Sequence, residues 1–213
     1  MVEVVEGVRA INLSEAGRLS LECYLLDCPQ GVVLVDTGMQ ESAISKIEAE
    51  LTAMGKHWKD VKTVLITHKH GDHVNNLPKV KELTGAPIMA HEGDCADIRD
   101  AKKVDVTPLS HGQAIGYCGG IEVVSVPGHS QGNVCYYLPE KRVMIAGDTI
   151  FADENGVISA PPERYCMDVK QATRGISRLL DYDFDVLLVT HGKNTLKDAK
   201  AKVLELVDRC KSV

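Results

Sequence analysis

The chain has 213 residues, of which 44% are hydrophobic and 25% are charged. This length fits one domain with a sizeable core, and the composition is that of a globular protein rather than a disordered one. The net charge of −6 argues against a general nucleic-acid-binding role, because contact with phosphates requires clustered Lys and Arg. We therefore expect a single domain over residues 1–213, with neither nucleic acid nor a membrane as its partner.

The seven cysteines are scattered along the chain and include no C-x-x-C pair. An odd number at irregular spacing does not match the pattern of a disulfide framework. The first ten residues lack the apolar segment of a secretory signal peptide, and no stretch approaches the roughly eighteen apolar residues of a membrane span. We therefore expect reduced cysteines and a cytoplasmic location.

The first third of the chain favours short strands. Its β-branched segments, bounded by turn residues, predict an antiparallel meander over residues 2–11, 19–27 and 32–36. Apolar residues at helical spacing then predict a helix over 42–54. A buried strand over 61–67 and a helix over 75–83 follow, so the histidine-rich segment between them lies in a strand-to-helix loop.

The second half repeats this alternation of strands and helices. Strands are predicted over residues 87–91, 113–117, 121–126, 133–138, 143–146 and 186–190, and helices over 168–180 and 196–210. Two β-rich blocks with helices on the outside indicate an α/β protein. The expected architecture is an αββα sandwich, with two mixed sheets packed between helical layers.

Four metal-ligating side chains are crowded into the loop Thr67-His68-Lys69-His70-Gly71-Asp72-His73. Side chains two apart on an extended segment point the same way, so His68 and His70 can bind one ion. Asp72 and His73 can face a second ion where the chain turns into its helix. Zn²⁺ favours imidazole nitrogen, and a carboxylate helps to hold two dications. The loop therefore predicts a site for two metal ions.

This loop resembles the H-x-H-x-D-H signature of the metallo-β-lactamase superfamily. Later segments resemble other motifs of that family, namely Val126-Pro127-Gly128-His129-Ser130, Ala146-Gly147-Asp148-Thr149 and Val189-Thr190-His191-Gly192. The resemblance implies that His129 completes the first metal site, that Asp148 bridges the two ions and that His191 completes the second site. The implied metal ligands are His68, His70, Asp72, His73, His129, Asp148 and His191.

Other residues have a structural interpretation. The segment Val33-Leu34-Val35-Asp36-Thr37-Gly38 resembles the family's early Asp-Thr-Gly loop, which implies that Asp36 supports the metal loop without binding metal. Three histidines lie outside the motifs. His57 and His111 are interpreted as structural, and His91 as a core or rim residue.

The family resemblance implies hydrolysis by a hydroxide held between two divalent ions. Zinc is favoured, with iron or manganese as alternatives. Asp72 is the expected catalytic residue, because it can orient the hydroxide or transfer a proton in addition to binding the second ion. A nucleophilic Ser or Cys is not needed, and no G-x-S-x-G motif is present in the sequence.

The expected substrate is a small acyl compound, a thioester or lactone. The run from His129 to Tyr137 and the following Gly-Asp-Thr segment are similar to glyoxalase II-type thioesterases. In those enzymes the metal loop continues into Gly-Gly, whereas Val74-Asn75-Asn76 follows it here. Only about twenty residues follow His191, too few for the helical domain that holds glutathione in that subfamily. Both departures argue against glutathione specificity.

Two other functions are compatible with these motifs. A persulfide dioxygenase of the same superfamily would use one iron, held by His68, His129 and Asp148, and a non-catalytic metal-binding module would keep the ligands without turnover. The number of bound metal ions separates the dioxygenase from the hydrolase. Residues 153–166 lie between two metal motifs and form either a lid or a surface crossover.

Overall fold

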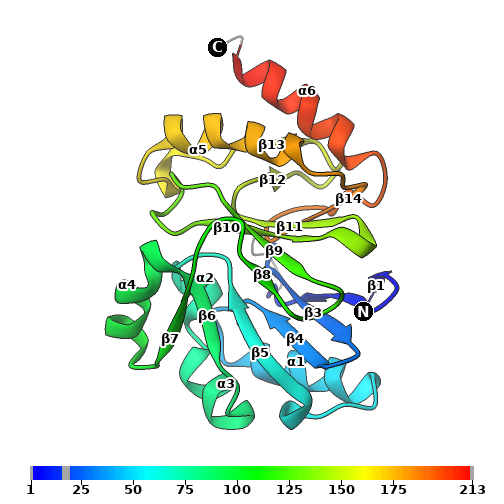
Figure 1. The fold of residues 1–213 in the computed structure, drawn as a ribbon, viewed down its shortest axis with the longest axis vertical. Coiled ribbons are helices and arrows are strands. Elements are labelled where there is room, and N and C mark those ends of the chain that lie inside the picture. Colours follow the sequence, from blue (N-terminus) through cyan, green and yellow to red (C-terminus); the bar gives the residue numbers. More distant parts are fainter. Residues whose placement is uncertain (1, 16–19, 212–213) are drawn as a thin grey trace. The chain divides into compact units, whose positions relative to one another are not determined.

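The computed structural model describes residues 2–15 and 20–211. Residue 19, with which the second predicted strand begins, lies outside them. The chain divides into two compact units, Met1–Leu109 and Ser110–Val213. Each unit is built on its own β-sheet with helices (Figure 1), which confirms the α/β class.

Unit 1 contains a seven-stranded sheet in the order β1-β2-β3-β4-β5-β6-β7. Its strands are Val2–Val5, Val8–Asn12, Glu22–Cys28, Gly31–Val35, Val61–Ile66, Ile88–His91 and Val106–Leu109. Neighbours from β1 to β4 pair antiparallel, as expected for short turns, and neighbours from β4 to β7 pair in parallel. The parallel arrangement of β4 and β5 places the residues that follow these strands at one edge of the sheet.

The helices of unit 1 form the crossovers between the parallel strands. They are α1 (Ser42–Ala53), α2 (Gly71–Val74), α3 (Leu77–Thr84) and α4 (Glu92–Lys102), with a 3₁₀ turn over Trp58–Asp60. Apolar side chains from α1, α3 and α4, such as Ile47, Val80 and Ile98, share one core cluster with Leu34 and Val64 of the sheet. The core thus fixes the crossovers that carry the histidine-rich loop.

Unit 2 contains a five-stranded sheet in the order β14-β11-β10-β9-β8 and a two-stranded sheet of β12 and β13. Its strands are β8 Ala114–Ile115, β9 Ile121–Ser125, β10 Val134–Leu138, β11 Val143–Gly147, β12 Phe151–Ala152, β13 Ile158–Ser159 and β14 Val186–Val189. Its helices are α5 (Val169–Gly175) and α6 (Ala199–Lys211), with 3₁₀ turns over Pro139–Lys141, Glu163–Tyr165 and Ile176–Asp181. Side chains of α6, including Val203 and Leu206, pack in one cluster with Met144 and Leu187 of the sheet.

The predicted elements agree with the structure in outline, with several differences. The strand predicted over residues 2–11 is divided into β1 and β2, and the short helix α2 precedes the helix predicted over 75–83. Helix α4 and strand β7 were not predicted, because Glu92–Lys102 is rich in charged residues and buries only Asp94, Cys95 and Ile98. The short β12–β13 pair was missed for lack of length. The predicted helix over 168–180 changes from α-helix to 3₁₀ helix after Gly175. None of the helices among the described residues is long and apolar enough to cross a membrane.

The cysteines depart in part from the expectation of reduced thiols. Cys23 and Cys95 of unit 1 and Cys135, Cys166 and Cys210 of unit 2 are free. Cys28 and Cys118 are instead disulfide-bonded, so the expectation is wrong for these two residues. The cytoplasmic location stays a prediction.

A close approach between Gly128 and helix α5 fixes the turn that precedes His129. Gly128 has a φ of +130°, and a Cβ added there would lie 2.2 Å from the backbone nitrogen of Ala172. The backbone N–H of Asp168 also donates to the Gly128 carbonyl at 2.9 Å. No side chain fits between this turn and α5.

We predict that Gly128→Ala destabilises the protein more than Gly120→Ala. Gly120 also has a left-handed φ, of +111°, but a Cβ there would meet nothing within 4 Å. Both substitutions carry backbone strain, so the difference isolates the steric conflict with α5, which should cost about 1–3 kcal/mol. Urea unfolding of both variants measures it, and equal losses of stability would contradict the close approach.

Candidate metal centre

The carboxylate of Asp36 organises the histidine-rich loop of unit 1. The backbone N–H of Thr67 donates to Asp36 Oδ1 at 2.9 Å, and the Thr67 hydroxyl donates to Asp36 Oδ2 at 2.7 Å. His73 Nδ1 lies 2.7 Å from the same Oδ2. Asp36 is 4% exposed and has a φ of +62°, a left-handed conformation that Asp tolerates better than most residues. The structural role predicted for Asp36 agrees with these contacts.

The contact with Asp36 sets the orientation of His73. Because a carboxylate only accepts hydrogen bonds, the proton of the His73 ring is held on Nδ1, which leaves the Nε2 lone pair available as a metal ligand. His73 Nε2 lies 3.7 Å from Asp72 Oδ2. The backbone supports the same geometry, since the N–H and the hydroxyl of Thr37 both donate to the His73 carbonyl at 2.8 Å.

The other two histidines of the loop lie beside His73. The ring of His68 lies 4.6 Å from the ring of His70 and 4.0 Å from that of His73, measured between centroids. His68 and His73 are fully buried, whereas His70 is partly exposed. The structure therefore brings together all four predicted ligands of unit 1, which we call the first set: His68, His70, Asp72 and His73.

A second buried carboxylate, missed by the sequence analysis, supports the loop from α4. Asp94 is fully buried, and its Oδ2 accepts the backbone N–H of Lys69 at 2.9 Å. Asn76, just beyond α2, donates through Nδ2 to the carbonyls of Thr37 at 2.8 Å and Gln40 at 2.9 Å. No sequence motif indicates Asp94, because helix α4 itself was not predicted.

The three predicted ligands of unit 2 follow strands that end at one edge of the sheet. Strands β9 and β11 are both antiparallel to β10, and β14 is parallel to β11. Their carboxyl ends therefore meet at the same edge, where His129, Asp148 and His191 follow β9, β11 and β14. We call these three residues the second set.

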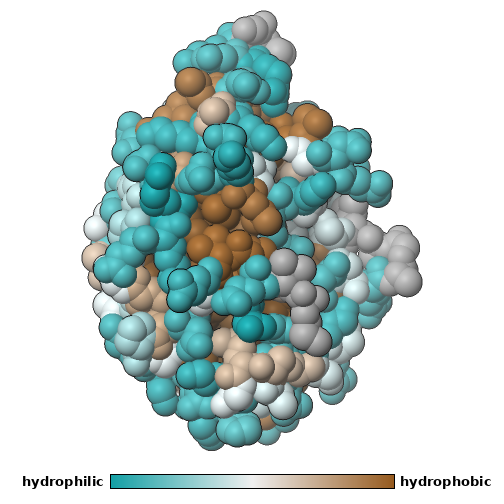
Figure 2. Space-filling model, turned by 90° about the vertical axis from the view of Figure 1, so that its right-hand side faces the viewer, coloured by the Kyte–Doolittle hydropathy of each residue, from teal (hydrophilic) through white to brown (hydrophobic). Residues whose placement is uncertain are grey.

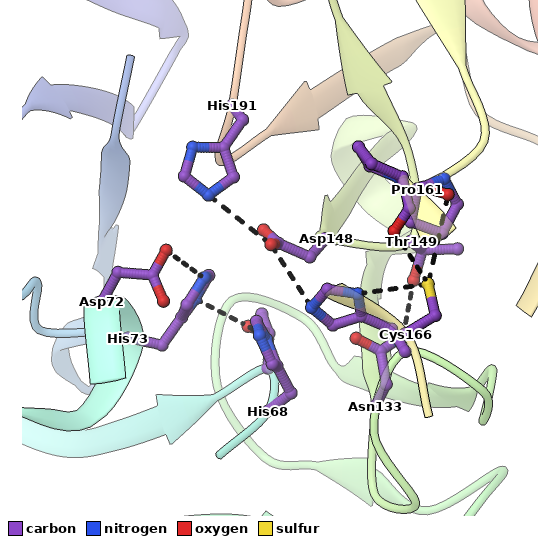
Figure 3. A network of polar contacts seen from close by, with 12 residues as sticks. His68, Asp72, His73, Asn133, Asp148, Thr149, Pro161, Cys166 and His191 are labelled. Atoms are coloured by element: carbon purple, nitrogen blue, oxygen red, sulfur yellow. Dashed lines mark hydrogen bonds and ion pairs between the residues drawn. The ribbon is translucent and has the colours of Figure 1, made fainter. Parts of the chain in front are cut away.

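Within the second set, a single carboxylate oxygen faces both histidines. Asp148 Oδ2 lies 3.4 Å from His129 Nε2 and 3.5 Å from His191 Nε2. Figure 3 shows His191 directed toward Asp148. Asp148 is 3% exposed and His129 is 1% exposed. These separations are those of donor atoms that can bind a common metal ion or two neighbouring ions.

Neighbouring side chains hold the second set in position. The ring of Phe151 stacks on His191 with a centroid distance of 5.1 Å and an interplanar angle of 19°. Cys166 Sγ lies 3.8 Å from His129 Nδ1, and burial, with the nearby carboxylate of Asp148, raises the pKa of this thiol. Sequence analysis singled out neither residue for this role, because neither belongs to the part of a motif that supplies ligands.

A polar network lies behind Asp148 (Figure 3). Asn133 Nδ2 donates to the Thr149 hydroxyl at 2.7 Å and to the Val126 carbonyl at 3.0 Å. The Cys135 thiol donates to the same hydroxyl at 3.2 Å, and burial raises its pKa to about 12. The network ties the Gly-Asp-Thr segment to strand β10 and to the residue that follows β9.

The remaining histidines have local structural contacts. His91 is the N-cap of α4, and its Nδ1 accepts the Gly93 N–H at 3.2 Å. His111 Nδ1 accepts the Ser125 N–H at 3.3 Å. His57 is the N-cap of a 3₁₀ turn. These contacts agree with the structural interpretation from sequence.

The donor atoms within each set suit divalent ions. The ligand atoms of His68 and His70 lie within 4.8 Å of each other, as do those of Asp72 and His73, and those of Asp148 and His191. Imidazole nitrogen and carboxylate oxygen are the ligands that zinc, iron and manganese share. The residues present therefore fit such ions, and all of them could serve as ligands.

Comparison with known proteins identifies the family. The family model described as the metallo-beta-lactamase superfamily matches residues 17–191. The chain belongs to this superfamily. A metallo-beta-lactamase family protein from Thermus thermophilus has a TM-score of 0.78 at 23% identity, covering 98% of this chain and 81% of that one. A metallo-beta-lactamase from Pontibacter korlensis has a TM-score of 0.76 at 20% identity, covering 94% of both chains. These likenesses show the metallo-β-lactamase fold, as expected.

The curated relatives include a hydroxyacylglutathione hydrolase and a probable metallo-hydrolase. The hydroxyacylglutathione hydrolase of Rhizobium meliloti (strain 1021) is 35% identical over 103 residues, a match that covers 48% of this chain and 39% of the relative. The probable metallo-hydrolase YflN of Bacillus subtilis (strain 168) is 23% identical and covers 99% of this chain and 94% of the relative. The resemblance to glyoxalase II-type enzymes is confirmed, although the match spans well under half of the Rhizobium enzyme.

We predict that Asp36→Asn mainly lowers the free energy of unfolding, rather than the rate of turnover. The amide would place a donor against either Thr67 or His73, both of which use the carboxylate as an acceptor. Loss of one such bond to a charged group should cost about 1.5–3 kcal/mol. Asp97→Asn removes the same charge from an exposed carboxylate that pairs only with Lys69 among the described residues, so it should cost under about 1 kcal/mol.

Urea unfolding of the metal-free variants tests this difference. A stable Asp36→Asn variant that had lost its turnover would instead assign Asp36 to the chemistry.

Proposed function

We propose that the chain is a binuclear metal-dependent hydrolase of small acyl substrates. In this proposal His68, His70 and His129 bind one ion, Asp72, His73 and His191 bind the other, and Asp148 binds both. The observation that carries it is the position of Asp148 Oδ2, 3.4 Å from one histidine nitrogen and 3.5 Å from another. The family resemblance assigns these two histidines to different ions, so an oxygen close to both of them supports a carboxylate shared by the two sites.

Two bound dications would supply Lewis acidity and would lower the pKa of water to near neutrality. The protein's part is to fix the ligands. Asp36 holds the proton of His73 on Nδ1, so Nε2 is presented as a lone pair. Phe151 restricts the rotation of the His191 ring by stacking. Asp148 would contribute negative charge that offsets the charge of the bound cations.

Asp72 is proposed as the catalytic residue. Its side chain is 23% exposed, unlike that of His73, which is fully buried. A partly exposed carboxylate could exchange a proton with solvent while its other oxygen binds metal. We therefore assign to Asp72 the transfer of a proton between the attacking water and the leaving group, in line with general acid–base catalysis.

A thioester or a lactone is the proposed substrate class. Support comes from the match to hydroxyacylglutathione hydrolase at 35% identity, an enzyme whose name states hydroxyacylglutathione as its substrate. The match covers only 39% of that enzyme, and Val74-Asn75-Asn76 stands where a Gly-Gly pair is expected. The proposal is therefore a small acyl group without a requirement for glutathione. Zinc is the favoured metal, and the cell compartment is proposed to be the cytoplasm.

We predict about two ions per chain in protein purified without added metal, with hydrolysis of a thioester or a lactone. Plasma mass spectrometry measures the ions, and the same sample is assayed for hydrolysis. His191→Ala should retain about one ion, because it removes a ligand of the second site only. Asp148→Ala should lose at least tenfold in affinity at both sites, since supporting changes alone cost about 10- to 100-fold.

His57→Ala is the matched control, because His57 lies in a 3₁₀ turn outside both sets and should retain full metal content. One iron per chain, with consumption of dioxygen and no hydrolysis, would instead identify a mononuclear dioxygenase. Two ions without turnover on esters, thioesters, lactones or phosphodiesters would identify a non-catalytic metal-binding module.

A further inference from the structure

A groove on unit 2 is lined by residues that belong to neither the first set nor the second set. It has a volume of about 900 Å³ and lies between β13, α5 and α6. Its apolar lining includes Val157, Ile158, Val169 and Leu206. Ile158 and Leu206 are buried at its base, whereas Val157 is 59% exposed. This volume is within the range of small-molecule sites, which bury apolar ligands against such linings.

All the charged residues that line the groove are positive. They are Lys170 and Arg174 on α5 and Arg209 on α6, and no Asp or Glu among the described residues lines the groove. The same three side chains make no ion pair with a carboxylate anywhere in residues 2–15 and 20–211. The chain as a whole carries a net charge of −6. A groove whose charged lining residues are all cations is therefore opposite in charge to the chain as a whole.

The contacts of Arg209 fix one positive charge at the edge of the groove. Arg209 Nη2 donates to the Ile158 carbonyl at 2.9 Å, which joins α6 to β13. Arg174 also lines a smaller hollow of about 260 Å³, together with Arg178 and Gln171. Within the described part of the chain, no carboxylate lines that hollow either. Cationic side chains therefore continue from α5 into the 3₁₀ turn over Ile176–Asp181.

Exposed apolar side chains are concentrated in the same unit. Among the described residues, the large hydrophobic side chains that are exposed are Met39 in unit 1 and Val157, Tyr165, Met167, Leu196 and Leu204 in unit 2. Figure 2 shows hydrophilic residues over much of one face, with hydrophobic patches among them, some toward the upper end, the level at which Figure 1 places α6. Of these residues, Val157 lines the groove together with the three cations. A surface that combines an exposed apolar side chain with cations suits a ligand that has both characters.

We propose that this groove binds an anionic amphiphile, an aliphatic chain that ends in a carboxylate. The aliphatic chain lies against Ile158, Val169 and Leu206. The carboxylate is bound by Lys170 and Arg174, neither of which makes an ion pair among the described residues. Charge complementarity selects this ligand over a neutral one, and the apolar base selects it over a small hydrophilic anion. The proposal depends on the groove alone and not on the proposed hydrolysis.

Titration calorimetry with sodium decanoate on the metal-loaded protein tests the proposal, with decanol and acetate as partial ligands. Decanoate should bind, and each partial ligand should bind at least about tenfold more weakly, since one lacks the charge and the other the apolar chain. Lys170→Gln combined with Arg174→Gln should weaken decanoate binding by about tenfold or more. Lys197→Gln combined with Lys202→Gln is the matched control.

The control removes two charges from exposed positions of the same unit that do not line the groove, so it should leave binding unchanged. Thr173→Trp, on α5, should abolish binding by filling the groove. A decanoate affinity that was equal in the two double variants would overturn the proposal. So would binding that disappeared when the metal ions were removed, because the carboxylate would then be a ligand of the metal centre. Neither result would alter the count of ions or the hydrolysis expected above.

Discussion

The buried carboxylate of Asp36 is the interaction on which the first set most depends. Asp36 receives two hydrogen bonds from Thr67 and lies against His73 Nδ1, so it fixes both the start of the histidine-rich loop and the tautomer of one ligand. Its own backbone is held in the left-handed region at a φ of +62°. Glycine would suit that backbone better but would provide no acceptor, so the side chain and the backbone place opposite demands on this position.

The second set depends on strand direction instead. His129, Asp148 and His191 follow three strands that point the same way, and glycines allow the chain to turn closely around them. A Cβ at Gly192 would come within 1.8 Å of the Ala152 carbonyl oxygen. The metal centre is thus proposed to combine a set held by buried hydrogen bonds with a set held by sheet geometry and close turns.

Much of this organisation could be predicted from sequence. Runs of β-branched residues bounded by turn residues located the strands that precede both sets. The motifs named the seven residues of the two sets, because most of these residues stand next to Gly or at strand ends. Asp94 could not be predicted, because the many charged residues of its helix leave too weak an apolar pattern. Its hydrogen bond from the backbone N–H of Lys69 also has no sequence signature. The contacts of Phe151 and Cys166 depend on chain segments far apart in sequence, which local patterns do not report. The groove was missed for the same reason, because its lining joins β13 to α5 and α6.

The two sets also differ in how far along the chain their members are spread. Every contact of Asp36 described above joins residues 36 and 73 or residues between them, whereas the second set reaches from residue 129 to residue 191. Closing a longer loop costs more entropy, although the increase is slow. During synthesis on the ribosome, the first set and its supporting carboxylate are present before any member of the second set. His191 is synthesised after every other member of the two sets, so a chain terminated before it would contain six of the seven residues.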